Sequence, residues 1–135
     1  MSLFTVFNIA GSSLHAQAVR LNTTASNLAN ADSVSSSTTT TYRARHPVFA
    51  TQLKAGDDTA AGVEVLGIVE SQAPLRREYQ PNHPLANQEG YVTMPNVNPI
   101  DEMADMISAS RTYQSNVEVM NTAKQLLLKT LALGE

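Results

Sequence analysis

The feature that most constrains this chain is a seven-residue repeat in its first 31 residues. Large apolar side chains recur every seven residues, at Phe7, Leu14, Leu21 and Leu28. A second row of mostly small residues is interleaved with the first: Phe4, Gly11, Ala18 and Ala25. Two such rows are the a and d positions of a coiled coil, on one face of a helix. They predict a helix from Leu3 to Ala31, roughly 42 Å long, which must bury this face against another helix.

The C-terminal segment carries a second long helical pattern. Asn98 is a preferred N-cap residue, and Pro99 suits the first helical position. Acidic residues follow at the positive end of the helix dipole, and Gly134 is a typical stop. Its apolar seam, widened by Ile107 and Leu128, steps by four and three residues: Met106, Ser110, Tyr113, Val117, Met120, Lys124, Leu127 and Leu131. The two terminal helices are therefore expected to pair with one another.

The middle of the chain has a different composition. Residues 33–96 contain every proline except Pro99, and residues 33–41 are a Ser/Thr run that predicts an extended or mobile loop. Alternating or β-prone runs predict short strands at 42–45, 48–51, 63–70, 75–79 and 90–95. A loop is predicted at 54–62 and a turn at 81–84. A β module of this size is marginal on its own.

The predicted fold is mainly α with a small β module. Long N- and C-terminal helices pair as a coiled coil, and a short-stranded β region is inserted between them. Residues 1–32 and 97–135 form the terminal-helix domain, and residues 33–96 form an extended loop plus the β module. Aromatic residues are 5% of the chain and Trp is absent, so the core must be aliphatic.

Patterns that carry enzyme or cofactor chemistry are not found. The chain has no Cys, its three histidines are far apart in sequence, and its glycines form no phosphate-binding loop. Asp57 and Asp58 lack the alternating oxygen ligands of a calcium loop. A net charge of -3 argues against nucleic acid, and no 18-residue apolar run predicts membrane insertion. We therefore expect no enzyme activity, no cofactor and no metal.

The surface of the first helix points to assembly. Residues 1–31 contain a single charged side chain, Arg20. A helix that is polar but uncharged all round suits burial against other chains, where Lys and Glu would cost desolvation free energy. Three alternatives remain open: a monomeric two-helix hairpin, a soluble coiled-coil adaptor that binds a single partner helix, and a membrane-surface protein. The last is disfavoured because neither helix has a Lys/Arg-rich polar face.

Specific motifs add a resemblance. The run 25–32 resembles the S/A-x-N-L-A-N signature that closes the N-terminal helix of bacterial flagellar rod and hook axial proteins. Residues 103–121 resemble the matching C-terminal motif, and the end of the chain is similar at 126–134. Between them, further runs resemble the short proximal-rod member of that family: 42–44, 70–74, 82–86 and 90–97. The similarity covers essentially the whole chain and departs from the family in the Ser/Thr run 35–41.

The resemblance implies a structural subunit of the proximal rod, the drive shaft that crosses the periplasm and transmits torque. Implied partners are the chain itself, neighbouring proximal and distal rod subunits, a basal-body adaptor and the flagellar type III export apparatus. Export would proceed without a cleaved signal peptide; no Lys or Arg precedes Leu3, and Thr5 and Asn8 interrupt the first apolar stretch. The terminal helices would polymerise through these residues: Phe7, Leu14, Ala18, Leu21, Ala25, Asn27, Leu28, Asn30, Met106, Ile107, Tyr113, Val117, Met120, Leu127 and Leu131.

Overall fold

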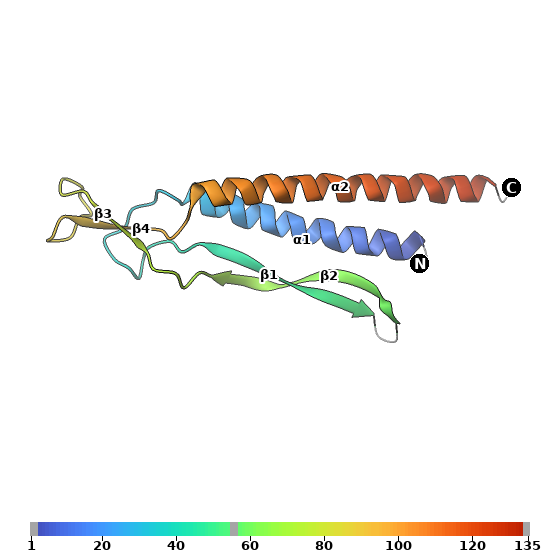
Figure 1. The fold of residues 1–135 in the computed structure, drawn as a ribbon, viewed down its shortest axis with the longest axis horizontal. Coiled ribbons are helices and arrows are strands. Elements are labelled where there is room, and N and C mark those ends of the chain that lie inside the picture. The colour runs from blue at the N-terminus through green and yellow to red at the C-terminus, as the bar shows by residue number, and fades with distance from the viewer. Residues whose placement is uncertain (1–2, 55–56, 134–135) are drawn as a thin grey trace.

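The chain forms an elongated molecule in which one helix lies between another helix and a β-hairpin (Figure 1). The computed structural model describes residues 3–54 and 57–133. In chain order the elements are α1 (Leu3–Ala29), β1 (Arg45–Lys54), β2 (Asp57–Glu70), β3 (Arg76–Tyr79), β4 (Tyr91–Met94) and α2 (Pro99–Ala132). The predicted fold class is confirmed: two long terminal helices enclose a small antiparallel β region.

The helix ends agree closely with the sequence patterns. α1 ends two residues before the predicted position, at Ala29. At the start of α2 the Asn98 side chain accepts a hydrogen bond from the Ile100 N–H, and Pro99 occupies the first turn. α2 ends at Ala132, where the Leu133 N–H donates to the Lys129 carbonyl. The predicted stop, Gly134, lies outside the described residues.

The β1–β2 hairpin is longer than predicted. Its antiparallel register runs from Arg45↔Glu70 to Lys54↔Asp57, with irregularities after Val48 and after Leu53. The prediction of separate strands at 42–45 and 48–51 is wrong, because β1 passes through Pro47 without a break. A two-stranded hairpin has an open edge on each strand, and an edge strand tolerates the missing proline N–H. The loop predicted at 54–62 is also wrong over 57–62, where pairing with β1 continues the ladder.

The second strand pair lies at the end of the molecule where α1 ends and α2 begins (Figure 1). β3 and β4 pair antiparallel from Arg76↔Met94 to Tyr79↔Tyr91, which confirms the strands predicted at 75–79 and 90–95. These strands form a sheet separate from the hairpin. The inserted region therefore consists of two two-stranded sheets.

The Ser/Thr run, predicted as an extended or mobile loop, is a loop, but it is folded on itself rather than extended. Ser35 and Thr93 exchange two backbone hydrogen bonds, of 3.0 and 3.1 Å, so the loop is tied to β4. The Thr41 hydroxyl is buried and donates to the Ser37 carbonyl at 2.7 Å. Short hydroxyl side chains bond readily to nearby backbone groups, which explains why a polar run closes on itself.

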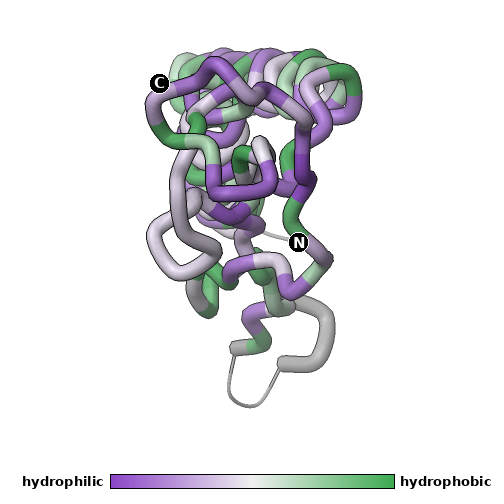
Figure 2. The backbone as a smooth tube through the Cα atoms, turned by 90° about the vertical axis from the view of Figure 1, so that its left-hand side faces the viewer, coloured by the Kyte–Doolittle hydropathy of each residue, from purple (hydrophilic) through white to green (hydrophobic). Residues whose placement is uncertain are grey.

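The best-packed region is the junction between the helices and the β strands. Ala31, Ala44 and Val97 form a buried cluster against which Tyr42 packs, and Val92 and Pro95 are among the largest fully buried side chains. Elsewhere, hydrophobic and hydrophilic segments are interspersed along the chain (Figure 2). None of the described helices is long and apolar enough to cross a membrane.

Candidate assembly surface

The contact between α1 and α2 is fastened by polar side chains. The Asn116 amide donates to the Ser13 hydroxyl at 2.9 Å, and the Arg20 guanidinium lies 2.6 Å from the Asp105 carboxylate. Nearer the end of α1, the Asn27 amide donates to the Glu102 carboxylate at 3.0 Å. The three residues on α1 are spaced by seven, so one row of polar side chains reaches α2 between Ser13 and Asn27 of α1.

This polar row lies next to the predicted apolar seam. The leucine row of α1, at positions 14, 21 and 28, follows the contact row by one residue and is turned from it by about 100° on the helix. Those side chains, and Phe7 in the same row, are half-buried. The pairing of the two terminal helices is confirmed, and the assignment of this leucine row to the helix contact stays a prediction.

On α2 the buried centre consists of small residues. Ala109 is 0% exposed and Ala123 is 4% exposed, so the two helix backbones can approach closely at these positions. The predicted residues Met106, Val117, Met120 and Leu127 are half-buried beside this row. Ile107, Tyr113 and Leu131 are exposed.

The opposite side of α1 is covered by the hairpin. The Ser12 hydroxyl donates to the Ile9 carbonyl at 2.8 Å and accepts a hydrogen bond from the Val63 N–H at 3.1 Å. Val63 and Val65 of β2 are half-buried at this contact. α1 is therefore sandwiched, which leaves only part of its circumference open.

The open part of α1 carries no formal charge. Its exposed residues are Phe4, Asn8, His15, Asn22, Ala25 and Ala29. Arg20, the single charged residue of the helix, is bonded to Asp105. Sequence reasoning did not anticipate this partner, although a lone charge in an uncharged helix is itself a signal that a counter-charge lies opposite it.

The outward side of α2 is rich in apolar side chains. The large exposed residues of α2 are Ile100, Met103, Ile107, Tyr113, Val119, Leu126, Leu128 and Leu131. Of these, Val119 and Leu126 line a hollow that they share with Leu3 and Val6 of α1. Ile100, Ile107 and Leu128 are separated by multiples of seven residues, so they lie on a stripe that winds by about 20° per heptad around the helix. The consecutive leucines at 126–128 point to different sides, because successive residues are turned by about 100°.

The two asparagines of the N-terminal motif are engaged inside the subunit. Asn27 is 1% exposed, and its side chain bonds to Glu102, Tyr42 and the backbone of Arg45. Asn30 is half-buried and donates to the Ser26 carbonyl of its own helix at 2.8 Å. Of the predicted α1 positions, Ala18 is half-buried and Ala25 is exposed. Ala25 is therefore the predicted α1 position most open to a partner.

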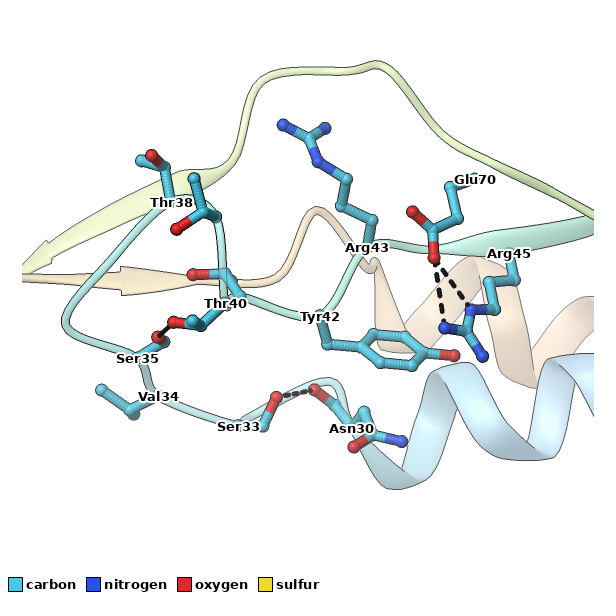
Figure 3. A pocket seen from close by; sticks show the side chains of 12 residues that line it. Asn30, Ser33, Val34, Ser35, Thr38, Thr40, Tyr42, Arg43, Arg45 and Glu70 are labelled. Carbon is cyan, nitrogen blue, oxygen red and sulfur yellow. Dashed lines mark hydrogen bonds and ion pairs between the residues drawn. The ribbon is translucent and has the colours of Figure 1, made fainter.

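A polar hollow lies beside the Ser/Thr loop (Figure 3). Arg45 closes one side of it through an ion pair of 3.1 Å with Glu70. Arg43 donates to the Ser71 and Ala73 carbonyls. The guanidinium groups that line the hollow are therefore already engaged by groups of the same chain, which disfavours an anionic ligand. Within residues 3–54 and 57–133, no three His, Asp or Glu side chains gather as a metal site.

The comparisons with known proteins agree with this architecture. Residues 7–35 match the family model described as "Flagella basal body rod protein", and residues 88–133 match "Flagellar basal body rod FlgEFG protein C-terminal". The flagellar basal-body rod protein FlgC of Salmonella typhimurium is 52% identical over 135 residues, and that of Yersinia enterocolitica is 53% identical. FlgC of Buchnera aphidicola from Acyrthosiphon pisum is 44% identical over 142 residues. Each alignment covers 100% of both chains.

The matched segments contain most of both helices, including the contact row of α1 and the buried alanines of α2. Identity over the full length extends the match to the hairpin and the junction. The chain therefore belongs to the FlgC family of flagellar basal-body rod proteins and is a structural subunit of the rod rather than an enzyme.

Proposed function

We propose that this subunit polymerises in the proximal rod through the outward faces of α1 and α2. The observation that carries the proposal is the chemistry of those faces: the open side of α1 has no formal charge, and the outward side of α2 exposes isoleucine, methionine and leucine. Uncharged and apolar surfaces lose little hydration free energy on burial and gain from the hydrophobic effect. A protein that stays monomeric normally carries charge on its exposed helix faces. The open side of α1 has none, whereas α2 exposes Arg111, Glu118 and Lys129 among its apolar residues.

The two outward faces differ, which favours a lattice over a single partner. If the α1 face and the α2 face each bind a different surface of a neighbouring subunit, the contacts are head-to-tail. Contacts of this kind build open helical assemblies. A soluble adaptor that binds a single partner helix needs one such face. The structure of the subunit therefore supports the rod over the adaptor.

The same geometry supports different roles for the terminal helices and for the inserted region. We propose that residues 1–32 and 97–135 form the axial core of the rod wall, where long helices carry torsion along the shaft. Residues 33–96 would lie outside that core. The neighbours would be further copies, other proximal and distal rod subunits and the basal-body adaptor.

The subunit is proposed to span part of the periplasm after export by the flagellar type III apparatus without cleavage. The contacts of α1 support this: Ser12, Ser13 and Arg20 bond to the hairpin and to α2. Removal of this segment as a leader would take away a helix that the rest of the fold uses.

A photo-crosslinking residue at Asn22, on the open side of α1, tests the assembly surface in cells. We expect cross-links to further copies and to other rod proteins, identified by mass spectrometry. A single unrelated partner would instead support the adaptor. The matched probe at Asn87, an exposed residue near β4, should give fewer rod cross-links because it lies outside the proposed core.

A charge on the same face is the complementary test. Ala25→Glu places a carboxylate on the exposed side of α1, so the folded subunit should be exported but should fail to build rods. Ala73→Glu makes the same change at an exposed residue that follows the hairpin, and we expect rods to form. Normal rods with Ala25→Glu would overturn the assignment of this face.

A further inference from the structure

Asn27 uses its whole hydrogen-bonding capacity inside the junction. Its amide nitrogen donates to the Arg45 carbonyl at 2.8 Å and to the Glu102 carboxylate at 3.0 Å. Its amide oxygen accepts from the Arg45 N–H at 2.9 Å and from the Tyr42 hydroxyl at 2.9 Å. An asparagine side chain has two donor hydrogens and two acceptor lone pairs, so each of them is satisfied at a site that is 1% exposed.

The pair of bonds to Arg45 imitates a β ladder. The amide offers Arg45 one acceptor and one donor, as a neighbouring strand residue would. α1 thereby holds the first residue of β1, and through Glu102 the same amide holds the first turn of α2. One side chain connects α1 to segments that lie 18 and 75 positions away in the sequence.

A second asparagine holds the hairpin from the other side. The Asn96 amide oxygen accepts from the Ala44 N–H at 2.8 Å, next to the residue that Asn27 binds. The Asn96 amide nitrogen donates to the Ser71 and Ala73 carbonyls, at 3.3 and 2.9 Å. The chain entering β1 and the chain leaving β2 are therefore both bonded to side-chain amides.

We propose that Asn27 is the positioning residue of an amide clamp, formed with Asn96, that fixes the hairpin to the helix pair. The clamp makes the helices and the hairpin one rigid body, so a load on one part moves the other without a change of angle. This role lies within a single subunit and does not depend on which neighbours the subunit contacts.

The pair formed by Asn27 and Glu102 provides a specific test by donor exchange. Asn27→Asp removes both donated bonds, leaves the Arg45 carbonyl without this partner and puts a second carboxylate against Glu102. Glu102→Gln keeps a carbonyl acceptor for Asn27. In the variant that combines both substitutions, the new amide at position 102 can donate to the new carboxylate at position 27, so the contact re-forms with donor and acceptor exchanged.

The angle between the parts can be measured on the full chain by pulsed electron paramagnetic resonance. The sequence has no cysteine, so spin labels on cysteines introduced at Asn22 of α1 and Thr51 of β1 report one distance. We expect a narrow distance distribution for the parent chain and for Glu102→Gln and loss of that distribution with Asn27→Asp. In the double variant we expect a partial return, because the contact with position 102 re-forms while the Arg45 carbonyl still lacks its donor. Swimming of cells that carry each variant should follow the same order.

Asn30→Asp is the matched control, because the Asn30 amide bonds within its own helix and its loss should leave the distance distribution unchanged. Recovery in the double variant supports the clamp whether Asn27→Asp loosens the subunit or unfolds it. A narrow distribution with Asn27→Asp, or a double variant no better than that single variant, would overturn the proposal.

Discussion

The helix shaft and the junction of this subunit are built on opposite principles. In the shaft, the part of α1 and α2 away from the β3–β4 end, the fully buried residues are small ones such as Ala16, Ala109 and Ala123. Large aliphatic residues there are half-buried on α1, and several on α2, such as Ile107 and Leu128, are exposed. In the junction, large residues such as Val92 and Pro95 are fully buried. The side-chain amides of Asn27 and Asn96 are bonded there to backbone groups.

The difference shows which part of the fold satisfies its hydrogen bonds and buries its apolar residues within one chain. The junction pairs the amides of Asn27 and Asn96 and buries its apolar residues without help. The shaft leaves apolar area exposed, and each large aliphatic side chain would contribute about 1.5–3 kcal/mol if a neighbour buried it fully. Stability of the free subunit should therefore depend on the junction, and assembly should depend on the shaft.

The largest effect is expected where a junction residue is truncated. Val92→Ala removes two methyl groups from a side chain that is 1% exposed and should lower the free energy of unfolding by about 2 kcal/mol. Leu128→Ala, at a residue 56% exposed, should change it by no more than about 0.5 kcal/mol but should weaken rod assembly. Urea unfolding of the full chain measures the free energy of unfolding of both variants. A greater loss of stability with Leu128→Ala than with Val92→Ala would contradict the contrast between shaft and junction.

Overpacking of the helix contact should come next. Ala109 is 0% exposed, so Ala109→Leu must push the helices apart or distort side chains, at a cost of about 1–3 kcal/mol. Ala104→Leu, at an exposed position of the same helix, should cost nearly nothing. Equal unfolding midpoints for the two variants would show that the helix contact is loose at Ala109.

A gain in stability is expected at Gln17 of α1. Its side-chain oxygen is buried and has no hydrogen-bond partner in the part of the chain that the structure describes. Gln17→Met removes that unsatisfied group at similar volume and should raise the free energy of unfolding by about 1 kcal/mol. Gln114→Met, at an exposed residue of α2, should leave it unchanged; a loss of stability at Gln17 would mean that its amide is bonded in solution.

The smallest expected effect is a pH dependence from Glu102. Burial raises the pKa of this carboxyl above its ordinary value of 4.5, with Asp105 and Asp101 acting in the same direction, against the bond from Asn27 and the nearby His46. The folded subunit therefore binds a proton more tightly than the unfolded chain, so this group makes stability fall as pH rises from 4.5 through the raised folded value. Glu102→Gln should remove that part of the slope in urea unfolding at a series of pH values, and an unchanged slope would contradict it.

Much of the fold could be predicted from local patterns. The seven-residue repeats located both helices to within a few residues, and Asn98 with Pro99 marked the start of α2, because caps and periodicity depend on neighbouring residues. The strands predicted at 63–70, 75–79 and 90–95 correspond, for the same reason, to the second half of β2 and to β3 and β4. The long β1 was not, since pairing with β2 overrides the interruption at Pro47.

The sequence by itself determined the helix lengths, the nearly uncharged character of α1 and the family resemblance. Each of these depends on residues that are close together in the chain. Only the tertiary structure decided which face of α1 contacts α2. A periodic helix presents several faces, and the face that contacts α2 depends on partners such as Asp105 and Asn116. It also decided that Asn27 faces inward. The bonds of Asn27 join groups 18 and 75 positions apart, a proximity that folding creates and that no local pattern encodes.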